Sequence, residues 1–174
     1  MTPGDGEEKD DLSGLPEHLR RWPGLYVREG ERIVEASPRD VAVAKSYPRF
    51  PDKGPVVDGV RITILTESTA HKVGDEVRVI HVVEFTEPGR RVYVMGPKPV
   101  YGETVNGELV AEPSPAGDPL VPAEYSGATL PSPAVDYNYD ITSYTFDAPG
   151  EYRIQWQPGS LESNTLAVTV GPAQ

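Results

Sequence analysis

From Val56 onward, apolar residues recur at every second position, and this period constrains the fold more than any other feature of the chain. In the clearest run, the residues that share one face are Val77, Val79, His81, Val83 and Phe85. A period of two is typical of a strand that packs one face against a core. Similar alternation covers residues 60–66 and begins again at residue 91. The second two thirds of the chain is therefore expected to form strands.

Turn signals separate these runs, and the strongest of them predicts a hairpin. Asn106-Gly107 tolerates the positive φ angles of a two-residue type I′ turn. Six prolines within residues 112–135 predict a long crossing connection rather than a central strand, because proline cannot donate to a strand ladder. We count about eight strands at spacings typical of an antiparallel β-sandwich, without the alternating helices that a parallel sheet requires. The predicted fold class is all-β.

Composition excludes several classes of protein. The 17 glycines and 19 prolines leave little room for long helices. The net charge of −11 opposes nucleic-acid binding, which requires cations that displace counterions from phosphates. No apolar run approaches the ~18 residues of a membrane span. Because the chain has no cysteine, disulfides, thiolate metal sites and cysteine nucleophiles are excluded.

Charge divides the chain into three predicted segments. Residues 1–17 are strongly acidic with almost no apolar content, which predicts a flexible tail. Residues 18–56 carry a net positive charge and are expected to form a strap with short helices. Residues 57–174 are acidic again and contain the strand pattern of the sandwich.

Within the strap, Ser37-Pro38-Arg39-Asp40 predicts the start of a helix. Serine is a preferred capping residue, proline suits the first helical position, and a carboxylate follows three residues after the cap. Tyr47 precedes a proline and is expected to end the helix. Two interpretations remain open. The strap lies across the acidic body, or it is a surface linker with a few helical turns.

The N-terminal sequence bears on the compartment. Its first eleven residues are acidic and polar, the opposite of the basic start and apolar stretch of a signal peptide. Such an N-terminal segment resembles the spacer that follows a membrane anchor or a removed signal peptide. We therefore favour an exported protein of the cell envelope, with a cytoplasmic protein as the alternative.

The last forty residues carry a resemblance to a known superfamily. The turn Phe146-Asp-Ala-Pro-Gly150-Glu-Tyr152 leads into an alternating strand that ends at Trp156. This region resembles the closing strands of bacterial immunoglobulin-like or fibronectin-like β-sandwiches, and the resemblance covers residues 57–172. It implies a tyrosine corner, in which the Tyr152 hydroxyl bonds back to the turn backbone. Domains of this class mostly bind or space other molecules.

The sequence contains none of the common catalytic motifs. His81 is of interest because it falls on a face that is expected to be buried and therefore needs a hydrogen-bond partner. It is either a core histidine bonded to a tyrosine or a backbone carbonyl, or part of a ligand pocket under the 112–135 connection. Glu84 lies three residues further and points to the opposite face, so the two cannot share a site. We favour a non-catalytic protein and keep a small enzyme as the alternative.

One segment has the spacing of a metal-binding loop. Asp136, Asn138 and Asp140 match the first oxygen ligands of a calcium loop. However, Ile141 stands where such a loop requires glycine, so an EF-hand is not expected. A looser calcium site and three solvent-facing side chains both fit the pattern, and calcium is the one cofactor that the sequence suggests.

Tyrosines gather in the second half of the chain. The candidate binding residues are Tyr101, Tyr125, Tyr137, Tyr139 and Tyr144, together with His81. Exposed planar rings suit a sugar platform or a protein interface. In an all-β protein, tyrosines also fill ordinary strand positions.

These observations predict a non-catalytic recognition or accessory module that is monomeric or weakly associating. Its expected partner is a protein or a glycan, bound through the loops 96–103 and 112–138, because sandwich domains mostly bind through loops held by a rigid scaffold. Two alternatives remain open. The first is a small enzyme or ligand-binding protein with a pocket lined by His81 and tyrosines, and the second is a structural subunit attached through residues 1–56.

Overall fold

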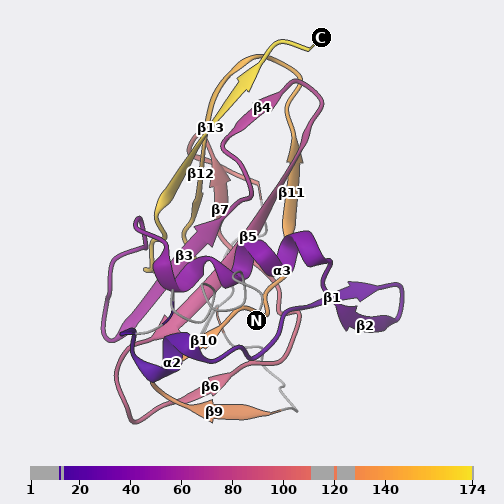
Figure 1. Ribbon diagram of the computed structural model, residues 1–174. Coiled ribbons are helices and arrows are strands. Elements are labelled where there is room, and N and C mark those ends of the chain that lie inside the picture. The colour runs from indigo at the N-terminus through magenta and orange to yellow at the C-terminus, as the bar shows by residue number, and fades with distance from the viewer. Residues whose placement is uncertain (1–11, 13, 111–119, 121–127, 174) are drawn as a thin grey trace.

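Two β-sheets packed face to face form the centre of the molecule (Figure 1). The structure is a computed structural model, and it describes residues 12, 14–110, 120 and 128–173. The first sheet, here called the central sheet, is built around β5 (Glu76–Phe85). Strand β3 (Val60–Leu65) pairs with one edge of β5, while β10 (Ala134–Asp136) and β11 (Thr142–Thr145) pair with the other.

The second sheet has five strands. Their order is β4 (Ala70–Lys72), β13 (Thr165–Gly171), β12 (Gly150–Trp156), β7 (Glu103–Val105) and β8 (Glu108–Leu109). Neighbouring strands are antiparallel except for β4 and β13, which are parallel. The described chain is thus mostly β with antiparallel pairing, as the alternating pattern predicts.

The strap forms a third layer on the outer side of the central sheet (Figure 1). It contains the short helix α2 (Glu17–Arg20), a hairpin of β1 (Tyr26–Glu29) with β2 (Arg32–Glu35), helix α3 (Pro38–Lys45) and the 3₁₀ helix η1 (Tyr47–Arg49). A second two-stranded sheet pairs β6 (Arg91–Tyr93) with β9 (Thr129–Pro131). In Figure 1, α3 crosses the middle of the molecule and the β1–β2 hairpin projects to one side.

Two hydrophobic clusters lie on the two faces of the central sheet. The inner cluster, between the sheets, includes Val60, Ile62, Val77, Val79, Ile154, Trp156 and Val168. The outer cluster, between the central sheet and the strap, includes Leu19, Leu25, Ala44, Tyr47, Leu65, Ile80, Val82 and Tyr137. The strap is therefore packed on its own domain from α2 to η1.

The outer cluster corrects the expectation that β5 buries only one face. Ile80 and Val82 point away from the sandwich interior and are nevertheless buried, because the strap covers them. Each apolar side chain removed from water contributes roughly 1.5–3 kcal/mol. The strand period shows which residues share a face, but it does not show that a segment from elsewhere in the chain covers the second face.

Local turn and cap signals agree with the structure. Ser37 caps α3, where its Oγ accepts a hydrogen bond from the Asp40 N–H at 3.3 Å. The turn between β7 and β8 consists of Asn106 and Gly107 with φ angles of 51° and 81°, as a type I′ turn requires. In contrast, β10 places residues 134–136 beside β5, although the proline-rich stretch was expected to hold no central strand.

The turn before β12 has the bond that a tyrosine corner requires. The Tyr152 hydroxyl donates to the backbone carbonyl of Ala148 at 2.7 Å, and the Phe146 ring stacks on Tyr152 with centroids 3.9 Å apart. The turn and the start of β12 are thereby held together.

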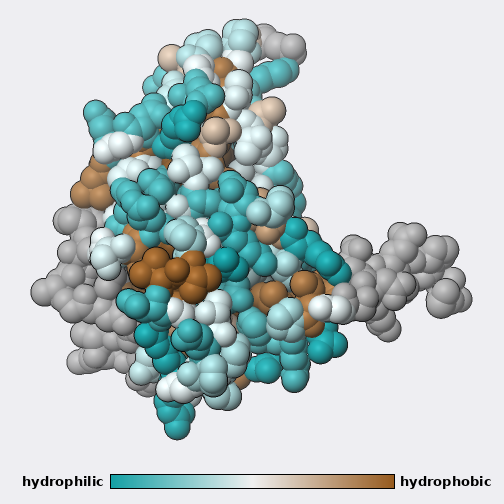
Figure 2. All heavy atoms as spheres, turned by 90° about the vertical axis from the view of Figure 1, so that its left-hand side faces the viewer, coloured by the Kyte–Doolittle hydropathy of each residue, from teal (hydrophilic) through white to brown (hydrophobic). Residues whose placement is uncertain are grey.

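The surface is mostly polar. Figure 2 shows that hydrophilic residues cover much of one face and that hydrophobic residues reach the surface in separate patches. Among the described helices, none is long and apolar enough to cross a membrane.

Candidate functional site

His81 lies on β5 and points between the two sheets. It is 0% exposed, and its Nε2 lies 2.5 Å from Oε2 of Glu103 on β7. The His81 and Trp156 rings are T-shaped with centroids 4.9 Å apart. The pair connects the two sheets through the inner cluster. The sequence predicted a tyrosine or a backbone carbonyl as the partner of His81, and the structure places a carboxylate there instead.

The Glu103 carboxylate is surrounded by donors. Its Oε1 accepts hydrogen bonds from Thr142 at 2.6 Å and from the Tyr144 hydroxyl, both on β11. Burial alone would raise the pKa of Glu103, but His81 and the two hydroxyls stabilise the carboxylate and hold that pKa below its usual range. Burial and the neighbouring carboxylate raise the pKa of Tyr144. Glu103 is therefore an ionised group fixed within the sandwich.

The surroundings of His81 favour a structural role for this pair, because the pair lies away from both pockets. Within the described residues, His81 Nδ1 is nevertheless a buried side-chain atom without a hydrogen-bond partner. Neither of the two pockets described below is lined by His81 or Glu103. Glu84 lies on the opposite face of β5, where it bonds to Tyr47 and His18, so it does not approach His81.

The structure separates the candidate tyrosines. Tyr137 packs in the outer cluster and Tyr139 in the inner cluster, and both are buried. Tyr144 is half-buried and bonded to Glu103, and Tyr101 is also half-buried. Tyr125 lies outside the described residues. The described tyrosines therefore do not form one exposed platform for a sugar.

Two of the three candidate calcium ligands are buried and already bonded. Asn138 donates to the carbonyls of Gly24 and Val94 at 3.0 and 2.7 Å, and its Oδ1 accepts from the Tyr26 N–H at 2.8 Å. Asn138 thus holds the start of the β1–β2 hairpin. The expectation that these side chains face solvent is wrong for Asp136 and Asn138, and Asp140 is exposed. No cluster of metal-binding side chains occurs among the described residues.

Asp136 forms a buried ion pair with Lys98. Lys98 Nζ lies 2.9 Å from Asp136 Oδ2, donates to the Met95 carbonyl at 2.8 Å, and stands 4.7 Å from the centroid of the Tyr139 ring. Burial lowers the pKa of Lys98 and raises that of Asp136, against the attraction between the two charges. The pair fixes the 96–103 loop against β10.

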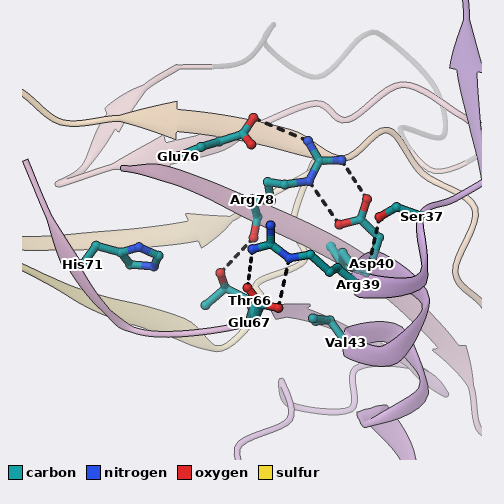
Figure 3. Close-up of a pocket in the computed structure, with 10 residues that line it drawn as sticks. Ser37, Arg39, Asp40, Val43, Thr66, Glu67, His71, Glu76 and Arg78 are labelled. Atoms are coloured by element: carbon teal, nitrogen blue, oxygen red, sulfur yellow. Dashed lines mark hydrogen bonds and ion pairs between the residues drawn. The ribbon is translucent and has the colours of Figure 1, made fainter. Parts of the chain in front are cut away.

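A small hollow of about 60 Å³ lies where α3 meets the central sheet (Figure 3). Arg78 donates to both Asp40 oxygens at 3.1 and 2.8 Å and to Glu76 at 3.4 Å. Arg39 donates to Glu67 at 2.5 and 3.2 Å. The hydrogen bond to Asp40 raises the pKa of Arg78. Because these charged groups bond to one another, we interpret the hollow as a structural contact. We call the bonds of Arg78 to Asp40 and Glu76, together with the bonds of Arg39 to Glu67, the α3 clamp.

A larger groove of about 790 Å³ lies on the strap, and we call it the strap groove. Its apolar lining includes Leu12, Leu19, Trp22, Phe50 and Tyr137. Its charged lining residues are Arg20, Arg21, Lys45 and Arg49, and among the residues that the structure describes no acidic one lines it. These four basic residues are exposed, whereas Trp22 and Phe50 are half-buried. In a protein of net charge −11, such a groove is the clearest candidate site for a ligand.

Aromatic side chains pack together along one wall of the groove. The Trp22 and Tyr137 rings lie 5.0 Å apart, and the Tyr47 ring meets Tyr137 edge-on at 6.1 Å. Lys45 Nζ stands 5.2 Å from the centroid of the Trp22 ring. Tyr137 directly follows β10, so the segment next to the central sheet supplies part of the wall. The wall of the groove is thus built from side chains that also contact one another.

Sequence reasoning missed Glu103, Lys98 and the strap groove. Glu103 and Lys98 stand in segments without a strong period, where no local signal separates a buried charge from an exposed one. Arg20-Arg21 alone is a pair too small to indicate a basic patch, but the fold adds Lys45 and Arg49 from further along the chain. For the groove, the one signal available in the sequence is the net positive charge of residues 18–56 in an otherwise acidic chain.

The chain matches none of the protein-family models, curated proteins or solved structures with which it was compared.

Proposed function

We propose that the protein is a non-catalytic recognition module that binds a protein partner in the strap groove. The observation that carries this proposal is the groove itself, a preformed apolar hollow of about 790 Å³ with a basic rim. Its volume falls within the ~300–1,000 Å³ of typical binding pockets. Aromatic and arginine side chains, both present here, are the residue types that contribute most to protein interfaces.

The placement of the titratable groups supports a role in binding rather than in catalysis. His81 with Glu103 and Lys98 with Asp136 are buried pairs that join elements of the fold. The α3 clamp is likewise satisfied by internal bonds. The strap groove combines solvent-exposed basic residues with an apolar floor, which suits docking.

The groove is a better candidate than the loops expected from the sequence. In the 96–103 loop, Lys98, Val100 and Glu103 are buried, so this loop mainly serves the core. Much of 112–138 lies outside the described residues. A purely structural role for residues 1–56 as an attachment arm is less favoured, because the strap packs on its own central sheet.

For the sandwich we propose an immunoglobulin-like architecture. Its support is the Tyr152 hydroxyl bond to Ala148 in the turn before β12, together with two facing sheets of mostly antiparallel strands. Such a scaffold is consistent with recognition, although the fold alone does not define a function.

Site-specific photocrosslinking tests the proposed function. Ala42 lines the groove and is exposed, while Ala167 is an equally small exposed residue on β13 in the other sheet. We replace each in turn with p-benzoylphenylalanine and irradiate the protein in its source cells. We expect a defined, mass-identified protein adduct from position 42 that is absent from position 167 and lost with Trp22→Ala. Equal adducts at both positions, or none at position 42, would refute the proposal.

A further inference from the structure

We propose that the strap groove binds a short acidic peptide segment that carries one apolar anchor side chain. This inference rests on the proposed function and names the chemistry of the partner. It follows from three observations: the charges of the rim, the nature of the floor, and the charge of the rest of the molecule.

The rim is basic because the ends of three helical segments meet at the groove. Arg20 lies in the last turn of α2, Lys45 in the last turn of α3 and Arg49 in the last turn of η1. The fold brings these three ends together, and Arg21 adds a fourth cation. Glu17 offers partial compensation through a 3.8 Å ion pair with Arg21.

The floor of the groove is apolar and aromatic, so a ligand that fits it needs an apolar side chain as well as negative charge. Trp22 and Phe50 line the groove and are only half-buried, so part of each residue remains in contact with water. An aliphatic or aromatic side chain placed there would remove this apolar surface from water, at roughly 25 cal/mol per Å². Carboxylates on either side of such an anchor would reach the basic rim. The two requirements together describe an acidic peptide with an apolar anchor.

The charge of the whole molecule distinguishes a short peptide from a long polyanion. Charges interact over a Debye length of about 8 Å at physiological salt. A short acidic segment therefore responds mainly to the four local cations. A nucleic acid or an anionic membrane extends over the acidic remainder of a chain with net charge −11 and would be repelled.

The experiment measures fluorescence anisotropy with a labelled probe peptide in which two glutamates stand on each side of one phenylalanine. Two comparison peptides replace the glutamates with lysine or the phenylalanine with serine. Inorganic phosphate is added as a competitor. We expect binding of the probe that weakens with salt, at least about tenfold weaker binding of each comparison peptide, and no competition by phosphate.

Matched charge variants localise the binding. Lys45→Glu in the groove is expected to weaken binding by about tenfold, whereas Arg32→Glu, an exposed reversal on β2, leaves it unchanged. Ala42→Glu serves as the second groove variant, because this residue is exposed and its replacement leaves the core intact. Thermal melting of all variants checks that they are folded.

The possible results separate this inference from the proposed function. Equal binding of the lysine peptide, displacement by phosphate, or an equal effect of Lys45→Glu and Arg32→Glu would overturn the acidic-peptide inference. If position 42 still crosslinks to a protein whose contact segment is not acidic, the proposed function stands and only this inference fails. If position 42 gives no adduct, the proposed function fails.

Discussion

The two faces of the central sheet each bury a carboxylate, but they satisfy it in different ways. On the inner face, Glu103 accepts from His81 and from two residues of β11, all parts of the sandwich. On the outer face, Glu84 accepts from the Tyr47 hydroxyl at 2.5 Å and contacts His18 Nε2 at 2.8 Å, both from the strap. The inner site is completed by the two sheets themselves, whereas the outer site depends on a separate layer.

This difference explains why the candidate ligand site lies on the outer side. The sandwich interior is closed from both sides by strands, and Glu103 there takes its partners from the sandwich itself. The strap contributes short elements whose outer surfaces remain in contact with solvent, and the groove forms between them. The strap thus serves both as a cover for the central sheet and as the wall of the groove.

Removal of each carboxylate tests this comparison most strongly. Glu103→Ala leaves His81, Thr142 and Tyr144 without their acceptor inside the sandwich, and we expect a loss of about 3–5 kcal/mol in the free energy of unfolding. Glu84→Ala removes bonds between the strap and the sheet, with an expected loss of about 1–3 kcal/mol. Urea unfolding measures both values.

Hydrogen exchange identifies which layer responds. Glu84→Ala should increase amide exchange in α3 and η1 while β12 and β13 stay protected. Glu103→Ala should increase exchange throughout both sheets. If Glu84→Ala destabilised the two sheets as much as Glu103→Ala does, the strap would not be a separable layer.

The pH dependence of stability sharpens the comparison. The pKa of Glu103 is held below its usual range in the folded state. Its stabilising contribution is therefore present above the unfolded pKa of about 4.3 and is lost as the pH falls through the lower folded pKa. We expect the wild type to lose stability in acid more steeply than Glu103→Gln.

Asp136 has the opposite tendency, and its contribution must be separated from that of Glu103. The raised pKa of Asp136 gives stability at low pH that is lost as the pH rises through the folded pKa. Since Glu103→Gln retains Asp136, the difference between the two pH profiles isolates Glu103. Parallel profiles would contradict the ionised state that we assign to Glu103.

The smallest effects are expected at the α3 clamp. Asp40→Ala removes two hydrogen bonds from Arg78 at the N-terminal end of α3, with an expected cost of about 1–2 kcal/mol. Arg39→Ala, its neighbour on the same helix, breaks an exposed pair with Glu67, and we expect no measurable change. Equal losses in both variants would show that burial does not govern the clamp.

Much of the fold follows from local signals in the sequence. The alternating runs indicate the strands, Ser37-Pro38 indicates the start of α3, and Asn106-Gly107 indicates the turn between β7 and β8. Each of these signals arises within a few residues of the chain, where backbone geometry and capping act directly. The mostly β character of the protein was therefore predictable.

The buried pairs and the groove were not predictable in the same way. His81 and Glu103 are 22 positions apart and meet because two sheets pack together. Lys98 and Asp136 are 38 positions apart, and the basic rim requires residues of α2, α3 and η1 to meet at one groove. Such contacts depend on tertiary packing, and a single sequence gives no measure of which distant charges meet.

The chain contains two tryptophans, and they lie on opposite sides of the central sheet. Trp156 is fully buried in the inner cluster, whereas Trp22 is half-buried in the strap groove beside Lys45. The protein therefore carries an intrinsic fluorophore in each layer. Emission from Trp156 reports whether the sandwich is intact, and emission from Trp22 reports the state of the strap. With Trp22→Phe and Trp156→Phe as references, separation of the strap and unfolding of the sandwich become two distinguishable optical events in one unlabelled sample.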